Sequence, residues 1–273
     1  METSSKSRQH LSSIRALILD MDGVLWRGEQ PIGDLPMIFA DINRCGCRVV
    51  LATNNSTLTA EQYREKLARM GVAVECWQIV NSSVAVAHFL RQQFPKGGPV
   101  YMIGEVGLAV ALQEENFYHS EAGVQAVVVG MDRQVTYDQM TRAALLIRSG
   151  CPFIGTNPDK SLPTPAGLVL GTGAILAAIE AATDVAPHVI GKPEPEMYRV
   201  ALERLGVAPH ETLVIGDRLE TDIAGAQALG CHTALVLSGV TSMEVAHSWV
   251  PAPDIIATDL AEIVEHVLCK RSG

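Results

Sequence analysis

The sequence has no long apolar run, no apolar segment at its N-terminus and no excess of positive charge. No stretch approaches about 18 uninterrupted apolar residues, so we expect no membrane-spanning helix. Residues 1–13 are polar, so we expect no signal peptide and a cytoplasmic protein. The chain carries 21 basic and 30 acidic residues, a net charge of −9, which argues against a nucleic-acid partner because such binding needs a basic surface. Small anionic substrates stay open, since a local cluster of donors overrides the overall charge.

Paired cysteines, linkers and repeats are also missing. Six cysteines are scattered along the chain, and only Cys45 and Cys47 lie close together. No second pair complements them for zinc, so we expect reduced thiols in an intracellular protein. The 273 residues contain no low-complexity linker and no short-period repeat, so any domain boundary has to be argued from the content of the segments.

Apolar runs of strand length alternate with helical patterns along nearly the whole chain. The runs are rich in Val and Ile and apolar on both faces, as in parallel strands covered by helices; they are residues 15–19, 48–52, 100–103, 124–129, 152–156, 213–215 and 233–237. Glycine punctuation and capping predict helices at 60–70, 172–183, 194–205 and 221–229, with Thr59 capping the first. Repeated βα units indicate an α/β fold with right-handed crossovers.

Acidic and polar clusters divide the chain into two parts. Residues 14–82 and 187–273 carry these clusters at the ends of predicted strands. Residues 83–186 have strands and helices of their own but no paired carboxylates at a strand end. We therefore predict a second domain, residues 83–186, inserted into the first.

Four polar clusters follow predicted strands, and ligands in open parallel sheets bind at the carboxyl ends of strands. An acid at a strand end often only caps a helix, and Thr-Asn-Asn is ordinary loop chemistry, so each cluster alone is weak. Together they supply a carboxylate nucleophile, a proton shuttle, a metal ligand and donors for phosphate oxygens, the parts that phosphoryl transfer needs. The clusters are Asp20-Met21-Asp22-Gly23, Thr53-Asn54-Asn55-Ser56, Gly191-Lys192-Pro193 and residues 216–222.

The first cluster places two acids one residue apart. In an extended chain Asp20 and Asp22 share a face, with Met21 on the other. Two close carboxylates both ionise readily only when a cation or a set of donors lies between them. Magnesium satisfies this requirement, because it is a hard ion that prefers oxygen ligands.

Taken together, these motifs resemble the haloacid dehalogenase-like superfamily, whose first motif is Asp-x-Asp-Gly-Val/Thr. Within it the chain resembles the NagD-like branch, which includes p-nitrophenyl phosphatases, phosphoglycolate phosphatases and pyridoxal phosphatases. The matching segments, from about residue 14 to about residue 258, are DMDGVLWRG, ATNNST, VVVGMDRQVTY, GTNPD, GTGAILAAIE, IGKPEPEMY and VIGDRLETDIAG.

The resemblance implies an architecture and an activity. The fold is a doubly wound parallel-sheet (Rossmann-like) core, residues 14–82 and 187–273, with a large inserted α/β cap, residues 83–186, that sets substrate specificity. The activity is that of a magnesium-dependent phosphatase, a hydrolase that acts on small phosphorylated metabolites through an aspartyl-phosphate. A homodimer that pairs through the cap is a further expectation.

The same resemblance implies roles for the acids and for Lys192. Asp20 is the nucleophile, and Asp22 protonates the leaving alcohol and then deprotonates the attacking water. Lys192 pairs with Asp20 and with the phosphate. Asp20, Asp217 and the backbone carbonyl of Asp22 bind Mg²⁺, and Asp222 orients the waters of the metal.

Phosphate and substrate contacts are also implied. Thr53 and Asn54 bind phosphate through the hydroxyl and a backbone N–H, with Asn55 beside them. Asn157 and Asp159 are the cap residues expected to reach the substrate. The alternative for this last pair is an Asx-turn, in which the Asn side chain only shapes its own loop.

Other interpretations stay open at this point. A phosphotransferase or phosphomutase would use the same aspartyl-phosphate but pass the phosphoryl group to a sugar hydroxyl. A non-catalytic protein that senses a metabolite is the alternative outside the enzymes. Trp26 either lines a substrate entrance or packs in the core. Leu162 occupies the position where pyridoxal phosphatases carry a substrate-contacting histidine, which argues against pyridoxal phosphate as the main substrate.

Overall fold

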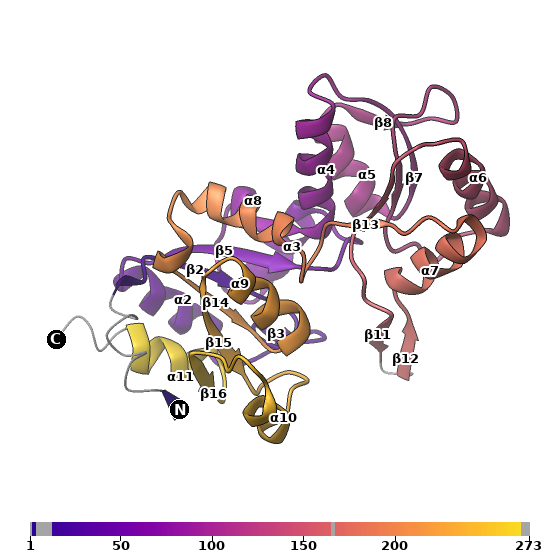
Figure 1. Cartoon of the computed structure of the whole chain (residues 1–273). Helices are drawn as coiled ribbons and strands as arrows, with labels where there is room; N and C mark the ends of the chain where they lie inside the picture. The colour runs from indigo at the N-terminus through magenta and orange to yellow at the C-terminus, as the bar shows by residue number, and fades with distance from the viewer. Residues whose placement is uncertain (1, 4–12, 165–166, 269–273) are drawn as a thin grey trace. The chain divides into compact units, whose positions relative to one another are not determined.

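The contacts of the chain divide it into two compact units. The computed structural model describes residues 2–3, 13–164 and 167–268. The first unit comprises Met1–Thr53, Tyr63–Ile79 and Tyr198–Gly273, and the second comprises Asn54–Gln62 and Val80–Met197. Each is built on its own predominantly parallel sheet, and each is described by itself (Figure 1).

β2 (Ala16–Leu19) lies inside the seven-stranded sheet of the first unit. The strand order is β1-β16-β15-β14-β2-β5-β6. Parallel pairing joins β5 to β2, β2 to β14, β14 to β15 and β15 to β16, whereas β1 pairs with β16 antiparallel. All residues of β2 and β14 are buried, as expected for strands covered on both faces. The other bounds are β1 (Glu2–Thr3), β5 (Arg48–Thr53), β6 (Ile79–Asn81), β14 (Thr212–Gly216), β15 (His232–Val236) and β16 (Ile255–Ala257).

The strand order reverses beside β2. From β2 the chain continues outward through β5 and β6, then returns to β14 on the opposite side of β2 and continues through β15 and β16. With right-handed crossovers, the helices of the two halves cover opposite faces, which is the doubly wound topology predicted from the sequence. The carboxyl ends of β2 and β14 flank this switch point, where ligands bind in open α/β sheets.

Most helices predicted from capping and glycine signals are present. α3 (Ala60–Arg69) begins after Thr59, whose hydroxyl accepts the Gln62 N–H at 3.1 Å, while the Gln62 side chain accepts the Thr59 N–H at 2.9 Å. This reciprocal capping confirms the predicted start. α7 (Thr172–Thr183) and α8 (Pro195–Leu205) also match their predictions.

The helix predicted at 221–229 is irregular at its start. It opens as a wide turn, η4 (Leu219–Ile223), with π-type hydrogen bonding, and continues as α9 (Ala224–Ala228). The carboxylate of Asp222 turns back to accept the Arg218 N–H at 3.1 Å. That local bond competes with regular helical geometry, and helical periodicity alone does not reveal it.

The second unit is a five-stranded parallel sheet of order β13-β10-β9-β7-β8. The strands are β7 (Gly98–Ile103), β8 (Phe117–His119), β9 (Val127–Val129), β10 (Phe153–Gly155) and β13 (His188–Val189). Figure 1 shows α4 (Ser82–Gln93) and α5 (Val106–Glu114) on one side of this sheet, with α6 (Tyr137–Arg148) and α7 on the other. The core under α6 and α7 contains Tyr101, Ile103, Val127, Val129, Met131, Ala143, Ile147, Phe153, Ile175, Leu176 and Ile179.

The remaining elements are short, apart from α2. They are α2 (Leu35–Arg44), η2 (Cys76–Gln78), η3 (Pro209–Glu211), α10 (Met243–Ser248), α11 (Leu260–Ile263), η5 (Val264–Leu268), the hairpin β3 (Trp26–Arg27) with β4 (Gln30–Pro31), and the hairpin β11 (Ser161–Thr164) with β12 (Gly167–Leu170).

Residues 83–186, predicted as an inserted cap, all lie in the second unit. The contacts assign residues 54–62, 80–82 and 187–197 to that unit as well. The boundaries at 82 and 187 stay predictions. The added segments include Asn54 and Lys192, two of the residues expected to bind phosphate.

Two expectations from missing features have structural counterparts. Within residues 2–3, 13–164 and 167–268, no helix is both long and apolar enough to cross a bilayer. Five cysteines are free thiols, and Cys269 lies outside the described residues. Burial raises the pKa of the Cys231 thiol to about 12.

An ion pair connects the ends of two neighbouring strands in the second unit. Glu105 follows β7 and precedes α5, and Arg133 follows β9. Arg133 donates from Nε and from a terminal guanidinium nitrogen to the two Glu105 oxygens, both at 2.8 Å. The Arg133 backbone N–H adds a third bond at 3.2 Å. Hydrogen bonding to the Arg133 side chain lowers the pKa of Glu105.

We expect Glu105→Gln to lower the free energy of unfolding by about 0.5–1 kcal/mol at pH 7, the range for a partly exposed ion pair. Because the folded-state pKa of Glu105 is lowered, its contribution is present above the unfolded-state value of about 4.3 and is lost as the pH falls through the folded-state pKa. The difference between variant and wild type should therefore shrink below about pH 4. Urea unfolding followed by circular dichroism at several pH values measures it.

Glu114→Gln is the matched control, because Glu114 is an exposed acid in the last turn of the same helix. At each pH in this range, the urea midpoint of Glu114→Gln should stay close to that of the wild type. A Glu105→Gln deficit that stays constant with pH would contradict the ion-pair account.

Candidate functional site

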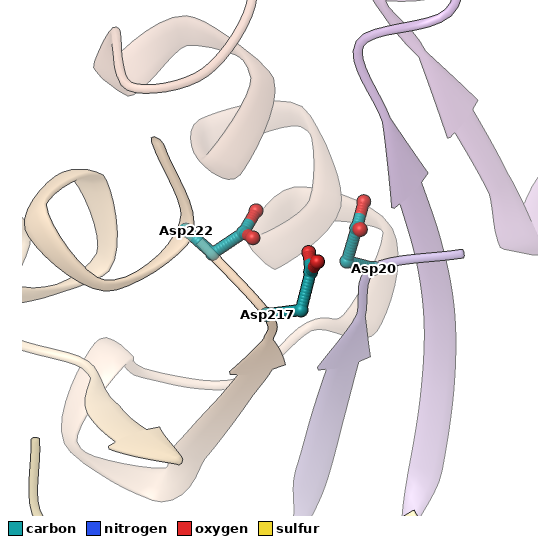
Figure 2. Close-up of side chains that lie close together, drawn as sticks. All are labelled: Asp20, Asp217 and Asp222. Carbon is teal, nitrogen blue, oxygen red and sulfur yellow. The ribbon is translucent and has the colours of Figure 1, made fainter. Parts of the chain in front are cut away.

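Three buried aspartates gather at the switch point of the first sheet. Asp20 directly follows β2, Asp217 directly follows β14, and Asp222 lies in η4. One carboxylate oxygen from each of the three lies within 4.8 Å of the others, and all three residues are buried. Figure 2 shows their carboxylates gathered at the ends of these strands. The register that pairs Ile215 with Leu19 sets the ends of the two strands side by side.

Asp217 is held by the loop that follows β15. The Val240 N–H donates to Asp217 Oδ2 at 2.8 Å, and the Thr241 hydroxyl donates to the Asp217 backbone carbonyl. A Cβ at Gly239 would overlap the Asp217 side chain. Glycine at this position therefore lets the loop close directly over the carboxylate.

The same loop also contacts the turn after β2. The Ser238 hydroxyl donates to the Gly23 carbonyl at 2.7 Å, and Arg27 Nε donates to the Ser238 carbonyl at 2.6 Å. Gly23 has φ +84°, and a Cβ there would lie 2.5 Å from Asp217 Oδ2. Both the backbone angle and the space require glycine at this position.

Asp222 is fixed by a hydrogen bond within its own turn and by Tyr198 of α8. Besides the bond from the Arg218 N–H, the backbone carbonyls of Thr221 and Asp222 accept the Tyr198 hydroxyl at 2.9 and 3.0 Å. A Cβ at Gly216 would overlap the Asp222 side chain. The glycine that ends β14 thus makes room for the third carboxylate.

This donor set fits a hard divalent cation. Three carboxylates so close together repel one another, and buried charges are stable only when they are paired or coordinate a metal. The available ligand atoms are carboxylate oxygens, the type that hard cations of the magnesium class prefer. The buried cluster can therefore hold a divalent metal ion.

Asp22 differs from these three acids. β2 ends at Leu19, and the N–H groups of Val24, Leu25 and Trp26 all donate to the Met21 carbonyl, where the chain turns. Asp20 is buried, whereas Asp22 is exposed. That the two side chains share a face stays a prediction. The Asp22 carboxylate is not in the metal-type cluster found among the described residues.

Tyr63 is buried beside Thr53, the last residue of β5. Burial raises the pKa of Tyr63, the charges of Asp22 and Asp20 raise it further, and the Thr53 hydroxyl partly opposes the shift. Tyr63 consequently stays a neutral phenol at ordinary pH. It can contribute packing and a dipole, but it is not a candidate base.

Four of the other predicted site residues, Asn54, Asn157, Asp159 and Lys192, come together within the second unit. The Asn54 side-chain amide donates to the Lys192 carbonyl at 3.0 Å and lies 3.3 Å from Asp159 Oδ2. The Asn157 amide donates to the Asn54 carbonyl at 2.8 Å, and the Ser82 hydroxyl donates to the same oxygen at 2.6 Å. Asn54, Asn157 and Lys192 are all buried. These contacts join three segments that the sequence analysis had identified separately.

The alternative interpretation of Asn157 has a direct counterpart in the structure. Asn157 Oδ1 accepts the Asp159 N–H at 3.2 Å, which is the Asx-turn expected from the sequence. Asn55 does similar local work, because its Oδ1 accepts both the N–H and the hydroxyl of Thr57 at 2.9 and 2.8 Å. Whether either side chain also contacts substrate stays a prediction.

The loop at residues 238–241 was not among the predicted clusters. It could have been found in the same way as the others, because Ser238-Gly239 directly follows the strand predicted at 233–237. Tyr63 and Lys66 were also missed, because they lie one turn apart on a helix whose pattern indicates only packing and solvent exposure.

Comparison with known proteins identifies the family of this chain. A model of haloacid dehalogenase-like hydrolases matches residues 17–118, and a HAD-hydrolase-like model matches residues 189–263. An acid sugar phosphatase of Staphylococcus aureus is 36% identical over 255 residues, which cover 93% of this chain and 98% of that protein.

Solved structures agree. A 4-nitrophenylphosphatase from Thermotoga maritima superposes with a TM-score of 0.89 at 32% identity, covering 94% of this chain and 99% of that one. NagD from Escherichia coli K-12 gives 0.85 at 34% identity, covering 92% and 98%. The chain belongs to the haloacid dehalogenase-like hydrolases, in their NagD-like branch of phosphatases.

Proposed function

We propose that the protein is a magnesium-dependent phosphatase that hydrolyses small phosphorylated metabolites through an aspartyl-phosphate on Asp20. The observation that carries this proposal is the cluster of Asp20, Asp217 and Asp222, whose carboxylate oxygens lie within 4.8 Å of one another at the switch point. The names of the relatives, an acid sugar phosphatase and a 4-nitrophenylphosphatase, support phosphate monoesters as the substrate class.

Asp20 and Asp22 divide the chemistry between them. A carboxylate oxygen of Asp20 attacks phosphorus, the bond from phosphorus to the ester oxygen breaks, and Asp22 gives its proton to the departing alkoxide. In the second half-reaction Asp22 takes a proton from water, whose oxygen attacks phosphorus. The bond to Asp20 then breaks, and inorganic phosphate leaves. The burial of Asp20 and the exposure of Asp22 agree with this division, because only the proton carrier has to meet different leaving groups.

Asp20 and Asp217 would ligate Mg²⁺ together with the backbone carbonyl of Asp22, and Asp222 would orient its waters. The bound ion would neutralise the clustered carboxylates and the phosphate oxygens. Oxygen-only donors favour hard ions of the magnesium class over zinc and copper.

Phosphate oxygens would be bound by the Thr53 hydroxyl, the Asn54 N–H and Lys192, with Asn55 beside them. Thr53 ends β5 and Asn54 follows it, the usual place for such donors in α/β proteins. We assign residues 83–186 the role of a cap that selects the substrate, with Asn157 and Asp159 as its contacts. Transfer of the phosphoryl group to a sugar hydroxyl is the competing outcome, and product analysis with added alcohols separates it from hydrolysis.

A cytoplasmic location and a homodimer stay predictions. A panel of sugar and other alkyl phosphates would identify which phosphate monoester the protein prefers.

Asp20→Asn should fold normally and lower turnover of p-nitrophenyl phosphate by about 10³-fold or more, because a neutral amide is a poor nucleophile. Phosphate release at saturating magnesium measures the loss. Asp138→Asn is the control, since Asp138 is an exposed acid in the first turn of α6. Activity of Asp20→Asn within about tenfold of wild type would refute the nucleophile assignment.

Gly239→Ala should raise the magnesium concentration needed for half-maximal activity by about tenfold, the scale for disturbing a group that supports a metal ligand. The new Cβ would overlap the Asp217 side chain and displace it. Calorimetric titration with Mg²⁺ checks the same change without turnover. Gly46→Ala is the control: Gly46 has φ +70° and nothing within 4 Å of a new Cβ, so stability falls but magnesium affinity should not. Equal magnesium curves for the two variants would place the metal elsewhere.

Asp22→Asn should separate substrates by the basicity of their leaving groups. An alkyl phosphate needs its alkoxide protonated, so losing the acid should cost about 10²–10⁴-fold in kcat/KM. The p-nitrophenolate group leaves without much protonation, so the first step with p-nitrophenyl phosphate should fall only mildly. Because the second step needs Asp22 for every substrate, the variant should show a burst of p-nitrophenol and accumulate phosphorylated Asp20. Equal losses for both esters and no burst would show that Asp22 is not the shuttle.

A further inference from the structure

A buried tryptophan holds the exposed acid of the site. Trp26 begins β3, is 1% exposed, and its indole N–H donates to Asp22 Oδ1 at 2.9 Å. Backbone contacts bring the two residues together, because Asp22 and Trp26 form an isolated bridge and the Gly23 N–H donates to the Trp26 carbonyl at 2.8 Å. One carboxylate oxygen of an exposed side chain is thus fixed by a donor that cannot itself move far.

The indole is held on two sides. Its ring stacks on Tyr63 with centroids 6.5 Å apart and planes 12° from parallel. Lys66 Nζ lies 4.4 Å from the centre of the Trp26 ring, donates to the Gly28 carbonyl at 2.8 Å, and pairs with Glu29 at 3.2 Å. Lys66 therefore connects α3 to the β3–β4 hairpin across the ring, a favourable cation–π arrangement.

We propose that Trp26 is a positioning residue that orients the Asp22 carboxyl group, so that its Oδ2 is the oxygen presented to the leaving group. The inference rests on the proposed function, in which Asp22 is the acid of the first step. The indole N–H occupies Oδ1, so Oδ2 is the oxygen left to exchange a proton with the leaving group and with water. The indole N–H also fixes the rotation of the carboxyl group, so that each turnover presents the same oxygen to the leaving group.

Packing alone gives a different expectation. A buried indole N–H usually finds a hydrogen-bond partner, and in that case Trp26 would matter only for folding. Its loss would then lower all activities alike and would not depend on whether Asp22 can donate a proton. A double-mutant cycle between Trp26 and Asp22 separates the two roles.

The cycle uses Trp26→Phe, Asp22→Asn and the double variant, each with magnesium and two substrates, p-nitrophenyl phosphate and a hexose 6-phosphate. Trp26→Phe keeps an aromatic ring against Tyr63 and Lys66 but removes the N–H. Asp22→Asn keeps a carbonyl oxygen for the indole but cannot donate a carboxylic proton. We expect Trp26→Phe to lower kcat/KM for the hexose phosphate by about 10²-fold, the scale for a misplaced catalytic group, and to lower it little for the aryl ester. Added to Asp22→Asn, it should cost less than about threefold more, because the group that it positions is already gone.

Trp77→Phe is the matched control, since Trp77 is an exposed tryptophan of the first unit and should leave both substrates unchanged. Thermal unfolding shows whether each variant is folded. If Trp26→Phe does not fold, β-(3-benzothienyl)alanine at position 26 replaces the N–H by sulfur in a ring of nearly the same shape and takes its place in the cycle.

The outcomes separate this inference from the proposed function. One outcome is that Asp22→Asn selectively loses kcat/KM for the hexose phosphate while the Trp26 variant keeps it. In that case the positioning role is wrong and the proposed function stands. If the two single losses add in the double variant, Trp26 acts independently of Asp22 and the inference is also wrong. If Asp22→Asn lowers kcat/KM equally for both substrates, Asp22 is not the acid, and the inference about Trp26 is wrong as well.

Discussion

Mutual repulsion of three buried carboxylates is the constraint around which the first unit is organised. Asp20, Asp217 and Asp222 bring like charges within 4.8 Å of one another in a site from which water is largely excluded, and folding would avoid that arrangement unless a cation balanced it. The parallel register of β2 and β14 sets two of the acids side by side, and η4 brings the third back toward them. Glycines at 23, 216 and 239 leave the space that the carboxylates occupy.

The positions of these carboxylates are predictable from the sequence because the signals for them lie next to one another in the chain. A buried strand followed at once by an acid is visible in the chain, and the carboxyl ends of neighbouring parallel strands meet at one edge whatever the rest of the fold does. For that reason the predictions at 15–19 and 213–215 placed Asp20 and Asp217 correctly at strand ends. Which strands are neighbours is not visible in the chain, because many strand orders satisfy the same pattern of alternating strands and helices.

What the sequence did not show depends on contacts between distant residues. Val240 contacts Asp217 from the loop that follows β15, and Lys66 covers the ring of Trp26 from a helix 40 positions along the chain. Neither partner belongs to a recognisable motif. The difference in exposure between Asp20 and Asp22 is not visible in the residue pattern for another reason: the chain turns at Met21, whose carbonyl accepts three N–H groups. A turn of this kind depends on which backbone donors find which acceptor, and residue pattern does not encode that.

One boundary between the two units falls inside the segment of residues 53–57. Thr53 belongs by its contacts to the first unit and Asn54 to the second, although one peptide bond separates them. Beyond that bond, the Ser83 hydroxyl donates to the Ser56 carbonyl, the Met131 N–H donates to the Ser56 hydroxyl, and the Gly107 N–H donates to the Thr57 carbonyl. A Cβ at Gly107 would lie 2.5 Å from the carbonyl oxygens of Ser56 and Leu58, so the start of α5 packs directly on this segment. Residues 54–57 are therefore anchored in the core of the second unit, one peptide bond away from a residue of the first. A change deep in the second unit can consequently move Asn54 without touching any carboxylate of the first.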